Sequence, residues 1–260
     1  MNDKIMVNLQ TLRSRPPTPV RGFTRTDLCG AIAAVCIIAG LVLPVLARSN
    51  NGSSRAVCFN NLKQMGMAMN MYADDYRDYL AFCNWDGGNS PGPGWLYSGT
   101  VANLNPTTPL YRNNAVGPWE SGAWFNYIND PKAYLCPLDV QLSNYPQRAN
   151  QLSSYVMDGA AAGFDAGNSY TTCKITQVWS PSCILMWEPD TRVAGINEYN
   201  DGANYPANGE NLAPLHTPDG SEVLSVGGNV TFVTTNGFAA QSAGTGRTLL
   251  WWSPFSVSGH

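Results

Sequence analysis

The sequence has few charged residues and only two histidines, and these scarcities limit the chemistry open to it. Charged side chains make up 13% of the 260 residues, and acidic residues outnumber basic ones by 18 to 15. Proteins that bind nucleic acid usually present a basic surface, so this composition argues against such a partner. No Cys-x-x-Cys or EF-hand pattern is present. The one Gly-x-Ser-x-Gly match, at 88–92, falls in a Gly- and Pro-rich stretch that predicts a loop rather than the strand-to-helix elbow of a hydrolase. We therefore predict neither an enzyme nor a dedicated metal site.

One long uncharged stretch stands out from the rest of the chain. From Leu28 to Ala47 no side chain is charged, and about 20 apolar or small residues are enough to cross a membrane as a helix. Residues 1–22 contain four basic side chains and one acidic side chain, and such positive charge keeps a segment in the cytoplasm. An uncleaved signal anchor and a secretory signal peptide share these features. The pattern predicts a transmembrane helix over 23–48, with the following residues on the opposite side of the membrane.

A short motif at the start of this stretch is more specific. Residues Gly22-Phe23-Thr24-Arg25-Thr26-Asp27 resemble the processing site of type IV prepilins and type II secretion pseudopilins. The resemblance implies that a prepilin peptidase cuts between Gly22 and Phe23 and that Phe23 is then N-methylated. It also implies that Asp27 stands where the family usually has glutamate, an acid that meets the methylated amine of a neighbouring subunit. Because a carboxylate costs on the order of 3 kcal/mol at the centre of a bilayer, Asp27 is expected to have such a partner.

A second helical segment is predicted beyond the membrane. The Ser, Asn and Gly residues between 48 and 55 disfavour a helix and predict a bend or a break. From Ala56 to Leu80 apolar residues recur at three- and four-residue steps. They are Cys58, Leu62, Met65, Met69, Tyr72 and Tyr76. This spacing predicts a face that packs on a sheet, which is a better interpretation of the methionines than a binding groove.

Two further motifs extend the resemblance. Residues Cys58-Phe59-Asn60-Asn61-Leu62-Lys63-Gln64 and Cys136-Pro137-Leu138-Asp139 look like motifs of a large bacterial subfamily of pilin-like proteins. That subfamily also tends to end in a His…Asp-Gly-His-Val segment. In this chain His216 lies in the corresponding region, but Gly227 and Asn229 replace the aspartate and the second histidine. We therefore do not assign to this chain any role that depends on the C-terminal motif of the subfamily.

Five cysteines follow the apolar stretch, in a part of the chain expected to face an oxidising compartment. Because five is odd, at least one thiol stays free or pairs between subunits. We predict a disulfide between Cys58 and Cys136, because it would tie the helix to the head. The segments 86–89 and 201–204 offer oxygen ligands for calcium, which major pseudopilins bind, but turn formation explains them equally well. No cofactor is predicted, and calcium is left open.

Beyond residue 80 short apolar runs alternate with Gly, Pro and Asn. Strands are predicted at 183–188, 222–226 and 229–233, the last two as a hairpin, with a further candidate at 248–252. The predicted fold class is α+β, with a long N-terminal transmembrane and stalk helix packed on a small antiparallel-sheet head. The expected domains are a prepilin leader (1–22), a transmembrane helix (23–48), a stalk helix (49–80) and an exported globular head (81–260).

By this resemblance the chain is expected to be a structural subunit of a type II secretion or type IV pilus-like filament in the inner membrane. The implied partners are prepilin peptidase, other pilin-like subunits and the assembly machinery. The alternative is a membrane-tethered protein that binds carbohydrate or mediates adhesion through some of its eight tryptophans, although core packing is the expected use of most. His216, Asp219 and Ser221 lie close in the sequence, but nearness does not make a catalytic triad, and His216 is expected to be structural.

Overall fold

The computed structural model describes residues 24–84, 93–98, 117–148, 150–164, 171–191, 201–206 and 211–260, without the side chains of 41–51 and Pro118. The chain divides between Arg48 and Ser49 into two compact units, unit 1 (Met1–Arg48) and unit 2 (Ser49–His260). The predicted cleavage residues, Gly22 and Phe23, lie outside the described residues, as does the candidate calcium segment at 86–89.

Helix α1 (Arg25–Asp75) is the longest element and contributes residues to both units. It is helical through 48–55, where the sequence predicted a bend or a break, so a break at this point is wrong. Ser, Asn and Gly each cost from a few tenths of a kcal/mol to about 1 kcal/mol relative to alanine. Helix propagation is cooperative, and the long helical segments on either side outweigh this local cost.

Unit 2 contains a five-stranded mixed sheet with the strand order β3-β1-β2-β4-β5. The strands are β1 (Val156–Asp158), β2 (Ile184–Trp187), β3 (Ala203–Asn204), β4 (Gly220–Ser225) and β5 (Val230–Thr234). Three neighbouring pairs are antiparallel, whereas β3 runs parallel to β1. The sequence predictions of β2, β4 and β5 are confirmed, as is the hairpin between β4 and β5. Residues 248–252 are not a strand.

Short helices precede β1, lie between β1 and β2, and follow β5. The α-helices among them are α2 (Gly117–Glu120), α3 (Phe125–Ile128) and α5 (Thr235–Ser242). The 3₁₀ helices are η3 (Pro131–Tyr134), η4 (Asp139–Gln141), η5 (Tyr145–Gln147), η6 (Gly159–Ala161) and η7 (Ile175–Gln177). Helix α5 begins at an N-cap in which the Thr234 hydroxyl accepts a hydrogen bond from Gly237 N–H at 3.0 Å.

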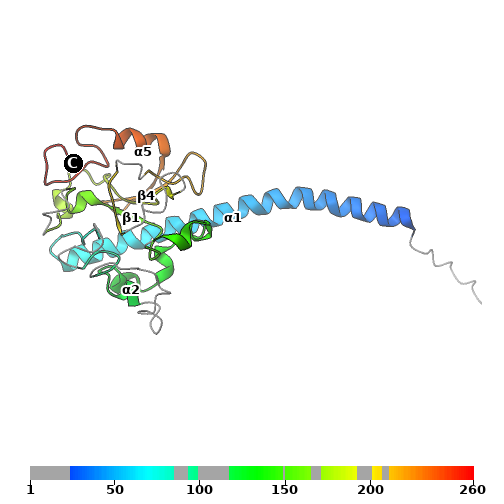
Figure 1. Ribbon diagram of the computed structural model, residues 1–260, viewed down its shortest axis with the longest axis horizontal. Helices are drawn as coiled ribbons and strands as arrows, with labels where there is room; N and C mark the ends of the chain where they lie inside the picture. Colours follow the sequence, from blue (N-terminus) through cyan, green and yellow to red (C-terminus); the bar gives the residue numbers. More distant parts are fainter. Residues whose placement is uncertain are drawn as a thin grey trace, which may run out of the picture. The chain divides into compact units, whose positions relative to one another are not determined.

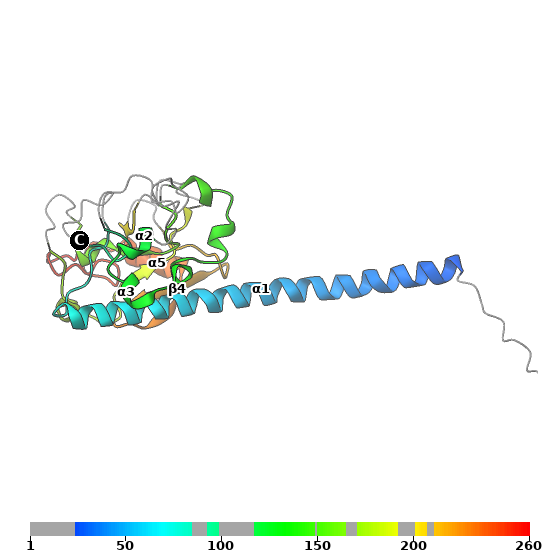
Figure 2. The ribbon, with the colours of Figure 1, turned by 90° about the horizontal axis from the view of Figure 1, so that it is seen from below.

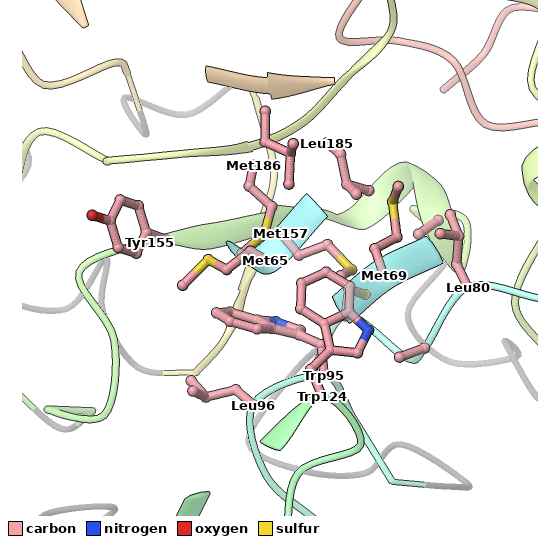
Figure 3. Packing of buried hydrophobic residues seen from close by; sticks show 14 of the residues in the cluster. Met65, Met69, Leu80, Trp95, Leu96, Trp124, Tyr155, Met157, Leu185 and Met186 are labelled. Atoms are coloured by element: carbon pink, nitrogen blue, oxygen red, sulfur yellow. The ribbon is translucent and has the colours of Figure 1, made fainter. Parts of the chain in front are cut away.

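The sheet is covered on both faces, with the C-terminal part of α1 on one side and α5 on the other (Figures 1 and 2). On the α1 side, Met65 and Met69 belong to the same buried cluster as Met157 of β1 and Met186 of β2 (Figure 3). This confirms the prediction that the methionines pack against a sheet. On the α5 side, a second buried cluster contains Phe238 of α5 together with residues of three strands, among them Val156 of β1, Trp187 of β2 and Val223 of β4.

Two neighbouring side chains of β2 face the same cluster. Leu185 and Met186 both pack on the α1 side, although successive strand residues normally point to opposite faces. The register between β2 and β4 shifts between Ile184 and Met186, which is a β-bulge or a comparable irregularity. Such a shift turns one extra side chain inward, so β2 presents two large residues to α1 rather than one.

Contacts at two positions of α1 hold it to the β4–β5 hairpin. Arg55 forms an ion pair with Glu222 of β4 at 2.6 Å, and its guanidinium lies 5.2 Å from the ring centre of Phe232 on β5. Further along α1, a Cβ added to Gly66 would lie 2.9 Å from Leu224 Cδ1 and 3.4 Å from Gly228 O. A side chain at position 66 would therefore separate α1 from the hairpin.

The fold class expected from the sequence is wrong. The sheet is mixed rather than antiparallel, because β3, a strand of two residues, pairs parallel with β1. So short a strand carries no alternation that a sequence could reveal. Among the residues whose side chains are described, no helix is long and apolar enough to cross a membrane, so the transmembrane helix of that fold class is not observed.

Candidate functional site

Four buried side chains from separate parts of unit 2 converge beside the sheet. They are Cys58 of α1, Cys136 after η3, Glu188 at the end of β2 and His216 in the segment that leads to β4. One sulfur, nitrogen or oxygen atom from each lies within 4.8 Å of the corresponding atoms of the other three. We call these four residues the Cys–Cys–Glu–His cluster.

Two distances define the centre of the cluster. His216 Nε2 lies 3.4 Å from Cys136 Sγ and 3.3 Å from a Glu188 carboxylate oxygen, Oε2. The side chains of His216 and Glu188 are 0% and 2% exposed, so the pair is shielded from solvent. The imidazole therefore sits between a thiol and a carboxylate.

Hydrogen bonds from the neighbouring motif residues place the two thiols. Asn61, one turn of α1 after Cys58, donates through Nδ2 to the carbonyl of Leu135 at 3.0 Å. Cys136 N–H, the next residue along, donates to Ser154 Oγ at 2.9 Å. The amide of Asn61 thus joins α1 to the segment that carries Cys136, which brings the two cysteines of separate sequence motifs to one point.

The acidic and basic members are held beside the end of β2 and the start of β4. The carbonyl of Glu188 accepts a hydrogen bond from Ala213 N–H at 2.7 Å, which fixes the segment carrying His216 beside the end of β2. The hydroxyl of Ser221 on β4 donates to Glu188 Oε2 at 3.0 Å. Ser221 therefore contacts the carboxylate rather than the imidazole, and this arrangement is not that of a Ser–His–acid triad.

Burial and mutual contact shift the pKa values of three members. The hydrogen bond with Cys136 lowers the pKa of Cys58, but burial and the Glu188 charge outweigh it, and the pKa lies above its ordinary value. The hydrogen bond with Cys58, then burial and Glu188, raise the pKa of Cys136. Burial lowers the pKa of His216, but its contacts with Cys136 and Glu188 raise it overall to about 10. Both thiols therefore hold their protons unless a cation is nearby.

Two polar atoms of the cluster are buried without a hydrogen bond. These atoms are His216 Nδ1 and Glu188 Oε1. An unsatisfied buried polar atom costs about 1–3 kcal/mol, and more when the group is charged. Four polar side chains that converge at such a cost are more than the core requires.

The predicted disulfide involves two members of this cluster. Cys58 and Cys136 do lie close together, with sulfur atoms within 4.8 Å, and both are free thiols in the structure. Cys173 and Cys183 are also buried free thiols, and Cys83 is buried. The pairing of Cys58 with Cys136 as a disulfide stays a prediction.

The acid of the Cys136-Pro137-Leu138-Asp139 motif has a separate partner. Asp139 is buried and receives both Nη atoms of Arg148, at 2.7 and 2.6 Å. Arg148 also donates to the Thr191 hydroxyl at 3.0 Å. This bidentate pairing fixes the turn that follows Cys136. Within the motif, Cys136 therefore belongs to the cluster, whereas Asp139, three residues later, has a structural role.

In unit 1, Asp27 closes the first turn of α1. Its Oδ2 accepts hydrogen bonds from Thr24 N–H at 2.9 Å and Thr24 Oγ1 at 2.7 Å, while Asp27 N–H donates to Thr24 Oγ1 at 3.2 Å. This reciprocal arrangement is a capping box with aspartate in place of the usual glutamate. The residue that the sequence singled out for subunit assembly therefore also has a local structural role.

The remaining sequence candidates give a mixed result. Asp201 Oδ1 accepts a hydrogen bond from Ala203 N–H at 2.9 Å, which is the contact of a turn, and calcium binding by this segment stays a prediction. Among the residues that the structure describes, Trp179 is 49% exposed and six other tryptophans are buried. The buried tryptophans are Trp95, Trp119, Trp124, Trp187, Trp251 and Trp252.

Sequence reasoning missed Glu188 and did not connect His216 with the two cysteines. The signal available was that Cys58, Cys136 and His216 each lie in or beside a different motif of the resembled subfamily. Glu188 gave no signal, because a single acid after an apolar run is typical of a strand end. Comparisons with protein-family models, with curated proteins and with solved structures found no match.

Proposed function

We propose that the chain is a structural subunit of a pilus-like or type II secretion filament, and that it assembles through the N-terminal part of α1. The observation that carries the proposal is the exposure of apolar side chains in unit 1. Leu28, Ile32, Val35, Ile37 and Ile38 are between 51% and 65% exposed. No charged residue interrupts the sequence after Asp27 until Arg48.

The exposed residues do not form a single stripe. At about 100° per residue, Ile37 lies on the side of the helix opposite to Leu28, and Ile32 and Val35 lie near Leu28. A helix that is apolar on all sides is normally buried by other helices or by lipid. Burying a large aliphatic side chain fully gains about 1.5–3 kcal/mol, so five half-exposed ones leave a considerable driving force for association.

Processing is the second part of the proposal. Cleavage by a prepilin peptidase before Phe23 would leave Thr24 as the second residue of the mature chain. The capping box would survive, because it uses only Thr24 and Asp27. Assembly would then bring the carboxylate of Asp27 to the new N-terminal amine of a neighbouring subunit, and a misplaced subunit would leave this charge unpaired.

The proposed localisation follows from the leader. Its excess of basic residues favours a cytoplasmic N-terminus at the inner membrane, with residues 49–260 exported. The partners would be prepilin peptidase, further pilin-like subunits and the assembly machinery. Fractionation of cells, followed by protease treatment of intact spheroplasts, tests the localisation, since residues 49–260 should be degraded only where the protease reaches them.

The mature N-terminus tests the processing step directly. Mass spectrometry of the chain purified from its own cells should find Phe23 at the N-terminus, carrying one added methyl group. A Gly22→Ile variant is the control, because it blocks a glycine-dependent cleavage without touching α1. Mature protein that still carries residues 1–22 would contradict the proposal.

Variants of Asp27 separate its capping role from assembly. Asp27→Asn keeps a side chain that can accept the Thr24 hydrogen bond, whereas Asp27→Glu keeps the charge. We expect Asp27→Asn and Asp27→Ala to reduce the amount of sheared surface filament by at least about tenfold, and Asp27→Glu to retain it. Near-ultraviolet circular dichroism of the buried tryptophans controls for the fold of unit 2. Normal filaments from Asp27→Asn would show that the charge is not needed.

A further inference from the structure

We propose that the Cys–Cys–Glu–His cluster of unit 2 is a structural zinc site. The ligand atoms would be the sulfurs of Cys58 and Cys136, a carboxylate oxygen of Glu188 and Nε2 of His216. All four residues are buried, and the four atoms lie within 4.8 Å of one another. This site is independent of the filament proposal, because unit 1 contributes none of its residues.

The spacing of the donor atoms fits a tetrahedral metal site. Zinc binds sulfur at about 2.3 Å and nitrogen or oxygen at about 2.0–2.2 Å, so the edges of its tetrahedron measure roughly 3.3–3.8 Å. The distance from Cys136 Sγ to His216 Nε2 is 3.4 Å, and that from His216 Nε2 to Glu188 Oε2 is 3.3 Å. Two edges therefore have the length that zinc requires, and small shifts of the remaining side chains would complete the polyhedron.

The donor types indicate which metal fits. Thiolate and imidazole ligands suit zinc, whereas calcium and magnesium prefer oxygen ligands. Four protein ligands in a closed, buried position leave no place for a substrate or a reactive water, which is the arrangement of a structural rather than a catalytic zinc site. The site would therefore stabilise unit 2 and perform no reaction.

Neighbouring side chains supply outer contacts of the kind that orient metal ligands. Ser221 donates its hydroxyl to the Glu188 carboxylate at 3.0 Å, and Tyr155 forms a side-chain hydrogen bond with Cys58. The Tyr155 hydroxyl in turn accepts a hydrogen bond from Asn61 Nδ2 at 3.3 Å. Such contacts raise the affinity and fix the direction of each donor atom.

The binding reaction balances without an oxidant. Both thiol S–H bonds and the Nε2–H bond of the His216 imidazolium break, the three protons pass to solvent, and two Zn–S bonds, one Zn–N bond and one Zn–O bond form. The zinc charge offsets two thiolates and one carboxylate, which leaves one net negative charge in the ligand shell. A disulfide between Cys58 and Cys136 would compete with zinc binding, but it would not account for the presence of Glu188 and His216 beside the two sulfurs.

Metal content is the first test. The full-length chain, purified in detergent under reducing conditions, should contain about one zinc per chain by elemental analysis. Cys58→Ser and Glu188→Gln should each lower zinc affinity by at least about tenfold, since even outer contacts contribute that much. Cys183→Ser is the matched control, because Cys183 is an equally buried free thiol outside the cluster. Equal zinc loss from Cys183→Ser would overturn the assignment.

A second measurement uses the unchanged protein, in case the ligand variants fail to fold. A strong chelator should lower the melting temperature by about 5 °C or more and expose two further thiols to alkylation, and added zinc should reverse both changes. The proposal is overturned if the reduced chain takes up no zinc. It is equally overturned if the native chain has an intact mass lower by two hydrogens, with Cys58 and Cys136 joined to each other.

Discussion

At the scale of single residues, unit 2 buries several acids, and each is compensated differently. Asp139 has a bidentate partner in Arg148, and Glu188 contacts His216 and Ser221. Asp158 has no cationic partner among the residues that the structure describes. It accepts hydrogen bonds from Ala160 N–H at 3.0 Å and from the indole of Trp252 at 3.1 Å. Two neutral donors offset the burial of a carboxylate less completely than a guanidinium does.

We therefore expect Asp158 to make stability depend on pH. Burial raises the pKa of Asp158 well above its ordinary value, against the hydrogen bonds from Ala160 and Trp252, which lower it. The folded chain then binds a proton that the unfolded chain releases near pH 4. Its contribution to the free energy of unfolding is largest below pH 4 and falls as the pH rises toward the folded pKa, by up to about 1.4 kcal/mol per unit.

The comparison of wild type with Asp158→Asn isolates this contribution. Urea unfolding at pH 4.5 and at pH 7 should give a smaller loss of stability for the variant than for the wild type. The indole of Trp252 keeps a partner in either case, because it also donates to the carbonyl of Ile184 at 2.8 Å. Equal losses in the two proteins would mean that Asp158 is ionised in the fold.

The sequence brought Cys58 and Cys136 together as a predicted disulfide, but it did not connect them with His216 or Glu188. Cys58, Cys136 and His216 lie in or beside short motifs that are far apart in the chain. Their convergence depends on Asn61, whose amide holds the segment before Cys136, and on the hydrogen bond between Glu188 and Ala213. Such contacts join residues far apart in the chain, and no local pattern predicts them.

At the scale of elements, α1 approaches the sheet at a glycine. Gly66 costs about 1 kcal/mol of helix propensity relative to alanine or leucine. A Cβ there would lie 2.9 Å from Leu224 Cδ1, whereas at Gly52, in the same helix, nothing lies within 4 Å of the added atom. The close approach at position 66 explains why a poor helix former is retained in the middle of α1.

Matched substitutions of the two glycines test this explanation. Gly52→Leu should raise the free energy of unfolding by up to about 1 kcal/mol, because it improves helix propensity without a clash. Gly66→Leu should lower it by about 1–3 kcal/mol, because overpacking outweighs the gain in propensity. Chemical unfolding followed by tryptophan fluorescence measures both. The same sign for the two variants would contradict the proposed packing.

Elements with a strong local pattern could be predicted, and the others could not. The stripe from Cys58 to Tyr72 is buried as its spacing indicated, while Tyr76, after the end of α1, is 53% exposed. The β4–β5 hairpin follows from two strands joined through glycines. Strands β1 and β3 have three and two residues, so neither length allows an alternation to be recognised.

At the scale of the whole molecule, the larger buried core lies entirely in unit 2. Its members run from Cys58 to Trp252, so none comes from unit 1. The exposed apolar residues Leu28, Ile32 and Val35, in contrast, all belong to unit 1. The sequence indicated the apolar stretch directly, because a charge-free run is a local property. It did not indicate a mixed sheet covered on both faces, since that arrangement depends on pairing between distant segments.

A chain that begins at Ser49 should therefore fold and remain monomeric. It keeps every residue of the main core and removes the exposed apolar part of α1. Its melting temperature should lie within about 3 °C of that of the full chain in detergent, a difference of about 1 kcal/mol. Light scattering after size exclusion gives the mass. A shortened chain that still forms large oligomers would place the association surface in unit 2.

The order of the four cluster residues along the chain has a consequence for synthesis. Of the four residues, a ribosome makes Cys58 first and His216 last. A product that stops between residues 136 and 216 carries both thiols meant for the interior and lacks the imidazole that contacts Cys136. Premature termination therefore leaves reactive sulfur uncovered, and only a chain that extends beyond His216 can enclose it.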